Sequence, residues 1–412
     1  MFAKLAFKSL LNRKGSVFLT VIAMSVSVFA LLAVDHIRSQ TKDSFHSTVS
    51  GIDLIVGART GSLNLLLYSV FRIGNPTNNI DWSTYKSVAA NPKVAWAIPM
   101  SLGDSHRGYR VVGTTQDYFE HFSFGRKQTL DFDAGRPFAE VFDVVLGSEV
   151  AKKLNYTLGT NIVLAHGLGK TSFSLHDDNP FTVVGILKPS GTPVDQSLQV
   201  SLHGMEAIHN PRQPAAKLME QPLSAGQSTQ VLFEPEKITA FMLGLNSRLA
   251  TFNVQREINT YPREPLSAIL PGVALSELWQ MMSVLENTLR LISGLILVAA
   301  LLGLTAMMLA SVRERQREIY LLRVIGAPPI FLFLLIELEA IWVSGISILI
   351  GAAGLSFSLM IAQDFLAANY GLHIDANIFS QGTLHYALLV MGATAFAAAI
   401  PAIAVYRSAK IS

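Results

Sequence analysis

The feature that most constrains the fold is a stretch in which two long apolar runs flank a short charged segment. Residues 289–310 are apolar apart from Arg290, residues 311–329 are dense in charge and end in Gly-Ala-Pro-Pro, and residues 330–362 are again apolar. About 20 apolar residues are needed for a helix to cross the hydrocarbon core of a bilayer. The stretch therefore predicts a transmembrane hairpin whose charged turn lies at one membrane face.

The placement of basic residues predicts how the chain is oriented in the membrane. Four apolar segments can span a bilayer, at about 16–34, 289–310, 341–361 and 384–405. Lys and Arg precede the first span, fill the turn after the second and follow the fourth, whereas residues 363–383 carry neither. The positive-inside bias then puts both termini and the charged turn in the cytoplasm, and residues 36–285 on the other side.

The chain can be divided on this basis, with the first span kept as an anchor because no signal-peptide cleavage pattern follows it. Residues 1–14 are amphipathic and suggest a helix on the cytoplasmic surface, although a simple continuation of the first membrane helix is the alternative. The remaining expected parts are membrane helices at 15–35, 286–310 with a stalk, 330–362 and 384–406, an extracytoplasmic domain at 36–285, a cytoplasmic elbow at 311–329 and a short outer loop at 363–383.

The region 36–285 reads as a mixed α+β domain. Short β-rich runs end at turn residues, and helical patterns lie between them, one of them with Ser148 as its expected N-cap. Residues 203–236 contain three prolines and predict an exposed insertion or long loop. The chain has no cysteine, which excludes disulfides and thiolate metal sites, so the domain must be held by its own core. The predicted strands cover 53–57, 94–100, 109–113, 143–147, 161–165, 181–187, 238–245 and 267–270, and the predicted helices 82–90, 148–154 and 248–259.

Motifs for ligand chemistry are weak. The segment 166–171 (HGLGKT) resembles part of a phosphate-binding loop, but the motif requires a glycine where Leu164 stands. His166, His176 and the neighbouring Asp177 and Asp178 are compatible with a metal cluster, and a solvated loop explains them equally well. The sequence therefore predicts no catalytic, cofactor or metal site, and we expect this chain not to be an enzyme.

The charged turn is more informative. A charged helix continues into an apolar segment around Leu321 and Val324 and then stops at the Gly-Ala-Pro-Pro reversal, which is typical of a docking surface on a rigid elbow. Glu337 and Glu339 follow in an otherwise apolar helix, where carboxylates are costly unless they lie near the interface or are paired. Interfacial placement and an ion pair with cytoplasmic arginines or a partner are both open.

These residues resemble a known family. The charged R-x-R-x-x-E helix, the Leu-Arg-x-x-Gly-Ala elbow and the downstream Glu337 are similar to the FtsX-like permease domain, expected at 286–406. Residues 143–164 (with VLGSEVAKKL and LGTNIVL) and 181–187 (FTVVGIL) resemble the periplasmic core domain of MacB-type proteins. The fold implied is a membrane α-helical one with four transmembrane helices and an α+β periplasmic domain of porter and sabre subdomains.

The resemblance implies a type VII ABC permease of a cell inner membrane, acting as a homodimer or with a paralogous permease. MacB carries its ATPase in the same chain; this sequence has none, so a separate ABC ATPase that binds ATP and Mg is implied, as in the lipoprotein-releasing LolCE type. Membrane lipids and a periplasmic adaptor or lipoprotein are further expected partners, and nucleic acid is not. The positions that match the family's ATPase contact are Arg315, Glu318, Leu322, Arg323, Gly326 and Ala327.

Two functions follow from the resemblance. The first is mechanotransmission, in which ATP hydrolysis in the cytoplasm moves the periplasmic domain to extract or export an amphiphilic substrate such as a lipoprotein, lipid, peptide or drug-like molecule. The second is a regulatory protein that uses the same machine to control a periplasmic partner. A membrane-anchored hydrolase is a third class, but the sequence offers no site residues for it.

Overall fold

The chain folds into two compact units. The computed structural model describes residues 10–11, 13–125, 127–166, 179–209, 235–314, 316, 321, 324–370 and 374–411. The helical unit comprises residues 1–41, 282–365 and 374–412, and the sheet unit comprises residues 42–281 and 366–373.

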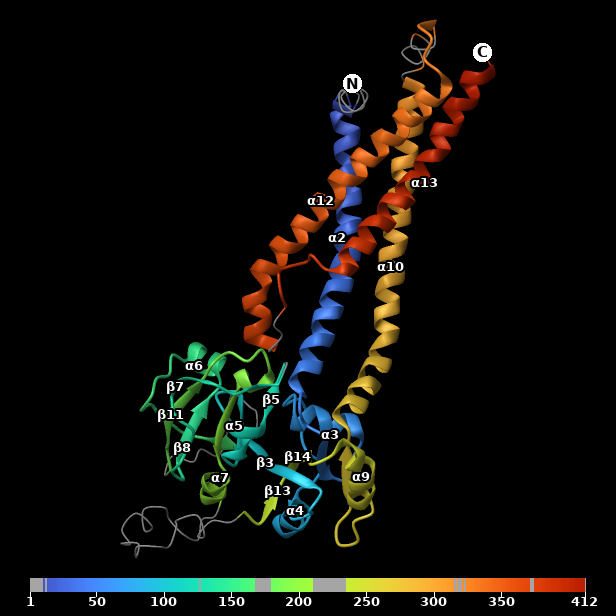
Figure 1. Ribbon diagram of the computed structural model, residues 1–412. Coiled ribbons are helices and arrows are strands. Elements are labelled where there is room, and N and C mark those ends of the chain that lie inside the picture. Colours follow the sequence, from blue (N-terminus) through green and yellow to red (C-terminus); the bar gives the residue numbers. More distant parts are fainter. Residues whose placement is uncertain are drawn as a thin grey trace, which may run out of the picture. The chain divides into compact units, whose positions relative to one another are not determined.

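Four long helices build the helical unit (Figure 1). They are α2 (Lys14–Thr48), α10 (Pro271–Glu314), α12 (Pro329–Tyr370) and α13 (Gln381–Ile411). Each contains a segment that is long and apolar enough to cross a membrane, and the search of the described residues gives these four spans. The four predicted spans are therefore confirmed.

Two of these helices extend well beyond their apolar segments. Helix α2 continues to Thr48, past the expected end at residue 35, because the residues in between contain neither Gly nor Pro to break it. Helix α10 begins at Pro271 and runs for 44 residues without interruption. The helical pattern before the second span and the span itself are thus one helix. Helix α13 likewise continues through Pro401.

Small polar residues line the contacts between the membrane helices. Ser27, Ser344, Ser347 and Thr394 are buried, although they lie in apolar helices. The Ser347 hydroxyl lies 3.3 Å from the carbonyl oxygen of Val21 on α2, and it also donates to the carbonyl one turn back in its own helix. Small side chains let membrane helices approach closely and hydrogen-bond across the contact. These bonds add to apolar packing, because large side chains such as Met24, Leu304 and Leu335 are buried in the bundle, while others such as Phe18, Leu302 and Phe396 face outward.

The sheet unit contains a large mixed sheet with short helices around it. The strands are β1 (Leu54–Ala58), β2 (Ile80–Asp81), β3 (Val94–His106), β4 (Tyr109–Thr114), β5 (Ser123–Phe124), β6 (Gln128–Thr129), β7 (Phe132–Gly135), β8 (Asp143–Leu146), β9 (Asn161–Ile162), β10 (Ala165–His166), β11 (Phe181–Leu187), β12 (Ser197–Ser201), β13 (Lys237–Ile238), β14 (Ala240–Leu245) and β15 (Leu266–Ile269). The helices are α3 (Ser62–Ser69), α4 (Trp82–Ala89), α5 (Asp117–His121), α6 (Ser148–Leu154), α7 (Leu202–His209) and α9 (Thr251–Asn259), with 3₁₀ turns η1 (Pro193–Gln196) and η3 (Arg248–Ala250). Each predicted strand region contains a strand, with shifted ends, but two regions are divided: 161–165 falls in β9 and β10, and 238–245 falls in β13 and β14.

The long strand β3 joins the two halves of the sheet. In the described residues the strand order is β15-β1-β14-β3-β4-β12-β8-β11-β7. The first part of β3 pairs with β14, with Met100 opposite Ala240, and its second part pairs with β4, with Leu102 opposite Val112. Strands β4 and β12 are parallel, as are β8 and β11, which makes the sheet mixed. One strand thus carries the chain from one half of the domain into the other.

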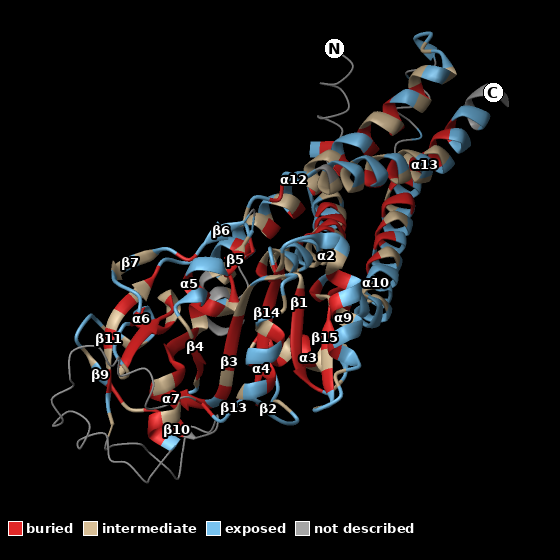
Figure 2. Ribbon diagram, turned by 60° about the horizontal axis from the view of Figure 1, so that its bottom comes forward, coloured by how far each residue is buried: buried red, intermediate tan, exposed pale blue. Residues whose placement is uncertain are grey.

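Apolar side chains on the strands form the core of this unit. Strands β1, β14 and β3 are buried over most of their length, as Figure 2 shows in red. One cluster packs α4 and α9 on the β1–β14–β15 half, and another packs α6 and α7 on the β8–β11–β12 half. A third cluster includes residues of both halves and the aromatic side chains of α5. This core needs no disulfide, in agreement with the absence of cysteine.

The structure corrects the prediction at two places, and it adds strands β2, β5, β6, β7 and β12 and helices α3 and α5 to the predicted elements. The region expected to be a loop from residue 203 begins instead with helix α7, whose Met205 and Ile208 are buried. Residues 210–234 lie outside the described part of the chain. Helix α6 has Gly147 at its N-cap, so Ser148 is the first helical residue and makes no capping hydrogen bond. Strand β12 was not predicted, because its polar residues hide a segment that is buried throughout.

Candidate functional site at the charged turn

The last four residues of the predicted elbow, 326–329, have the backbone geometry that their sequence requires, and from here on the name elbow refers to these four residues. The Ile325 amide donates to the Leu321 carbonyl oxygen at 3.1 Å, and Gly326 follows with a φ of +98°. Only glycine adopts that left-handed conformation without strain, which explains why the helical segment ends there. Pro329 is the first residue of α12, where its missing N–H costs nothing, and the Phe331 amide donates to the Pro328 carbonyl oxygen at 2.9 Å.

Large apolar side chains are exposed on both sides of the elbow. Leu321 is 58% exposed, Val324 67% and Ile325 83%, and Ile330 at the start of α12 is also exposed. A cluster of exposed apolar residues next to charged ones is a feature of protein interaction sites. The prediction of an apolar surface at this turn is therefore confirmed for these residues.

The predicted coupling residues are only partly described. Gly326 is exposed and Ala327 is half-buried, and both lie in the elbow as expected. Arg315, Glu318, Leu322 and Arg323 lie outside the described residues. Their contact with an ATPase remains a prediction.

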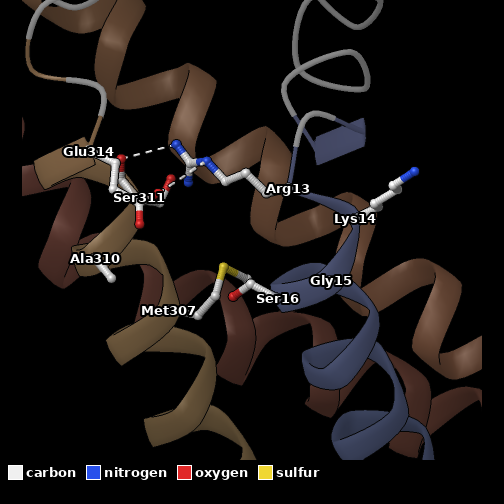
Figure 3. A pocket seen from close by; sticks show the side chains of 8 residues that line it. All are labelled: Arg13, Lys14, Gly15, Ser16, Met307, Ala310, Ser311 and Glu314. Carbon is white, nitrogen blue, oxygen red and sulfur yellow. Dashed lines mark hydrogen bonds and ion pairs between the residues drawn. The ribbon is translucent and has the colours of Figure 1, made fainter.

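One contact of this site was missed in the sequence. Arg13, just before α2, donates from Nη2 to the carbonyl oxygen of Ser311 at 3.0 Å, and its Nε lies 3.9 Å from Oε2 of Glu314 (Figure 3). The Arg13 side chain is 16% exposed. A cation at the C-terminal end of α10 is favoured because the last carbonyls of a helix lack partners within the helix. The predicted orientation places both residues at one membrane face, but nothing in the sequence pairs them.

A pocket of about 310 Å³ lies between the ends of these two helices. Figure 3 shows Arg13 reaching across it from the start of α2 toward Ser311 and Glu314 on α10. Met307 and Ala310 give the α10 side an apolar part. Ser311 lies three residues before the end of α10 and opens the charged turn, so the start of α2 is tied to the helix that leads into the turn.

The two membrane carboxylates both lie in the third turn of α12. Glu339 is buried, with 5% of its surface exposed, and Glu337 is half-buried. Ten residues separate Glu339 from Pro329, which corresponds to about 15 Å along a helix. Of the four arginines in the charged turn, Arg313 is described, whereas those at 315, 317 and 323 lie outside the described residues, so both interpretations of these carboxylates remain open.

The described part of the sheet unit shows polar groups that serve the fold. Asp195, 1% exposed, accepts hydrogen bonds from the amides of Ser190 and Gly191. Burial would lower the pKa of His209, but the hydrogen bond and charge of the buried Asp104 outweigh it, so this pKa lies above its ordinary value. Burial lowers the pKa of His106, which is held by the Val163 carbonyl and the Tyr156 hydroxyl.

The described residues contain one group with metal-ligand spacing. It consists of Asp117, Glu120 and His121 on α5, and all three side chains are exposed. Exposed acidic groups of this kind are common without a metal, so no metal function follows. Of the histidine and aspartate residues considered from the sequence, His166 ends strand β10, and residues 167–178 lie outside the described part of the chain.

Comparison with known proteins gives two family matches. The model for the MacB-like periplasmic core domain matches residues 17–257, and the model for the FtsX-like permease C-terminal domain matches residues 290–412. A comparison with functionally characterised proteins found no match.

Two solved structures are similar to this chain at 13% sequence identity each. One is the periplasmic region of MacB from Actinobacillus actinomycetemcomitans, with a TM-score of 0.34 over 57% of this chain and 97% of that one. The other is the extracellular domain of the ABC-type transporter YknZ from Gram-positive bacteria, with a TM-score of 0.30 over 53% of this chain and 98% of that one.

The family assignment rests on the two matches together with the four membrane helices. The first match spans more than half of the chain, and the second covers α12, α13 and most of the apolar part of α10. The mixed α/β unit and the helices are thus both accounted for. The chain belongs to the MacB/FtsX-type family of ABC transporter permeases.

Proposed function

We propose that this permease works by mechanotransmission. An ABC permease implies an ATPase partner, and the sequence itself contains no complete nucleotide-binding motif. In the proposed mechanism a separate ATPase subunit grips the charged turn from the cytoplasm, and ATP hydrolysis moves the turn. The helices then carry the movement to the sheet unit on the other side of the membrane.

The observation that carries this proposal is the exposed elbow. Its turn is fixed by Gly326 and the two prolines, and Leu321, Val324 and Ile325 present apolar surface beside it. A surface that is rigid, apolar and next to charges suits a protein partner better than it suits water. The tie from Arg13 to Ser311 supports the proposal, because a movement of the turn would be felt by α2 as well as by α10.

Helix α10 supplies a path for the movement. Its 44 residues form one helix, which corresponds to a rod of about 66 Å. The helix starts in the sheet unit and ends at the charged turn. A continuous helix can transmit a displacement, whereas a hinge in the middle would absorb it.

For the substrate, we propose an amphiphilic molecule such as a lipoprotein, lipid, peptide or drug-like compound that is extracted or exported. The support is the match of the large domain to the MacB-like core, which favours transport over purely regulatory action. Regulation of an extracytoplasmic partner is the alternative. We further propose an inner-membrane location, a dimer of permease subunits and a separate ATPase that binds ATP and Mg.

The elbow can be tested by purifying the full chain from its own membranes and measuring the ABC ATPase that accompanies it. Gly326→Pro forbids the positive φ, so we expect the amount of ATPase and its activity to fall at least about tenfold, as for loss of an interface hot spot. Gly303→Ala is the control, because a methyl group at this helical position would meet no atom within 4 Å. Unchanged ATPase in the Gly326→Pro complex would exclude the elbow as the coupling site.

A further inference from the structure

Four charged side chains lie between α2 and α10 in the helical unit, at the end of the apolar segments that is remote from the charged turn. Arg38 on α2 pairs with Glu286 on α10, and Arg290 on α10 lies 3.6 Å from Asp35 on α2, measured from Nη2 to Oδ1. The Glu286 and Asp35 side chains are 15% and 24% exposed. We call these four residues the alternating-charge cluster.

The cluster is held in place from α13. The Tyr386 hydroxyl donates to Asp35 Oδ1 at 3.2 Å, so that oxygen is shared with Arg290. Gly382 lies against the same carboxylate, since a Cβ there would stand 3.1 Å from Asp35 Oδ2. The buried His36 next to it has Nε2 2.8 Å from the Asp375 carbonyl oxygen. Asp35 therefore has a fixed position to which α10 must fit.

The order of charges along the two helices is the important feature. On α2 the acid Asp35 comes three residues before the base Arg38, and on α10 the acid Glu286 comes four residues before the base Arg290. At 1.5 Å per residue these spacings are about 4.5 and 6 Å, close to one helical turn. The observed pairing requires the two helices to run in opposite directions, so acid meets base at two successive levels.

A slide of α10 by one turn along α2 is opposed in both directions. If α10 moves by one turn in one direction, Arg290 faces Arg38, and Asp35 no longer has a cation opposite it. If α10 moves by one turn in the other direction, Glu286 faces Asp35, and Arg290 comes to lie opposite the apolar residues Leu31 and Leu32. Like charges that face each other across half-buried helix contacts repel, and a charge moved into an apolar layer loses hydration. Tilt or rotation of the pair about the cluster keeps both ion pairs.

We propose that the alternating-charge cluster is a register lock, which fixes the axial position of α10 against α2 and rejects one-turn slides. Helices α2 and α10 both continue from the helical unit into the sheet unit. The lock therefore fixes the axial register of the two helices that connect the units. A stroke at the cytoplasmic end then reaches the sheet unit as a tilt or rotation of the helix pair, without slippage. The lock depends only on these side chains, and it stands whether or not an ATPase drives the helices.

The register can be read by disulfide formation in the full-length chain in membranes, because the native sequence has no cysteine. Ser27 on α2 is buried, and its hydroxyl lies 3.4 Å from the Ile296 carbonyl oxygen on α10. Ser27→Cys is combined in turn with a cysteine at Ser293, Leu297 or Ala300, which are buried positions spaced about one turn apart. A disulfide needs Cβ atoms about 4 Å apart, so a slide of about 5.4 Å changes which pair oxidises.

The decisive variant exchanges one pair of charges without removing it. In Arg38→Glu combined with Glu286→Arg, acid still meets base at both levels, but α2 is now uniformly acidic and α10 uniformly basic. Each slid register then keeps one pair of opposite charges and sets no like charges of the cluster against each other, so the selection against slides is weakened while both ion pairs of the native register remain. We expect one dominant disulfide in the native background, and a fall of at least about fivefold in its ratio to the neighbouring disulfide in this variant.

Two further variants complete the test. Reversal of all four charges restores the alternation, and we expect it to restore the single dominant disulfide. The control is Lys93→Glu with Glu257→Lys, which exchanges an exposed ion pair in the sheet unit and leaves the profile unchanged. If Arg38→Glu with Glu286→Arg gives the native profile, the register lock is refuted, whether or not the four-charge reversal accumulates in the membrane.

Discussion

At the scale of single residues, the ion pair of His209 and Asp104 makes the sheet unit sensitive to pH. Nε2 of His209 lies 3.4 Å from Oδ2 of Asp104, which is almost fully buried on β3. The Asp104 charge raises the pKa of His209 above its ordinary value, although burial acts in the opposite direction. A group whose pKa is raised by folding stabilises the fold fully below its unfolded pKa, which is about 6.5 for histidine. This contribution is lost as the pH rises through the folded pKa.

We therefore predict that His209→Gln destabilises the protein more at pH 6 than at pH 8. The measurement is the thermal midpoint of the purified full chain in detergent at both pH values, with the native chain beside the variant. The difference between the two chains should shrink toward pH 8, because neutral histidine and glutamine then offer Asp104 similar hydrogen bonds. A difference that is equal at the two pH values would show that the charge of His209 adds nothing.

Single residues also show where prediction from sequence reaches its limit. Gly326 could be identified because a glycine between a helical pattern and two prolines has few alternatives. The contact of Arg13 with Ser311 joins residues 298 positions apart, and nothing local to either residue encodes it. The alternating-charge cluster was missed for the same reason, since each of its charges reads alone as a membrane-flanking residue.

At the scale of elements, the sequence predicts strands well where their residues are apolar and poorly where their buried residues are polar. Strand β11 (FTVVGIL) is apolar at every position except Thr182, and its observed bounds equal the predicted ones. Strand β12 contains Ser197, Gln199 and Ser201, and it is buried because β4 and β8 pair with it on both sides. The burial of β12 therefore results from its position between two other strands, and the local sequence pattern does not indicate that position. Helix α7 was missed because the prolines that follow it dominate the composition of that region.

The continuity of α10 leads to a prediction at this scale. Val284 lies in the helical unit just after the boundary with the sheet unit, and its side chain is 72% exposed, so its replacement removes little packing. Proline at this position removes a backbone hydrogen bond and costs about 3 kcal/mol in a helix interior, so it should kink or break the rod. We expect Val284→Pro to retain the ATPase but to lose the effect of nucleotide on the sheet unit.

That effect can be followed by limited proteolysis of the purified complex with and without ATP. In the native complex and in Val284→Ala, nucleotide should change the rate at which the sheet unit is cut. In Val284→Pro the rate should be the same in both states, while ATPase activity persists. A nucleotide-dependent rate in Val284→Pro would mean that the movement reaches the sheet unit by a path other than an unbroken α10.

At the scale of the whole molecule, the mechanism depends on which side of the membrane each part occupies. The basic residues place the charged turn in the cytoplasm and the sheet unit outside, but this orientation remains a prediction. An ATPase can reach only the cytoplasmic side, so the elbow has its proposed role only in this orientation. Two exposed side chains report on the two sides: Leu249 of the sheet unit is 91% exposed, and Ile325 beside the elbow is 83% exposed.

Because the native chain has no cysteine, single cysteines at these positions can be labelled without background. We predict that a membrane-impermeant maleimide labels Leu249→Cys in spheroplasts, whereas Ile325→Cys reacts only after the membrane is permeabilised. Equal labelling of both variants after permeabilisation controls for intrinsic reactivity, since both positions are open to solvent. If Ile325→Cys reacted in sealed spheroplasts, the turn would face away from ATP, and the exposed apolar residues around Gly326 would need an extracytoplasmic partner instead.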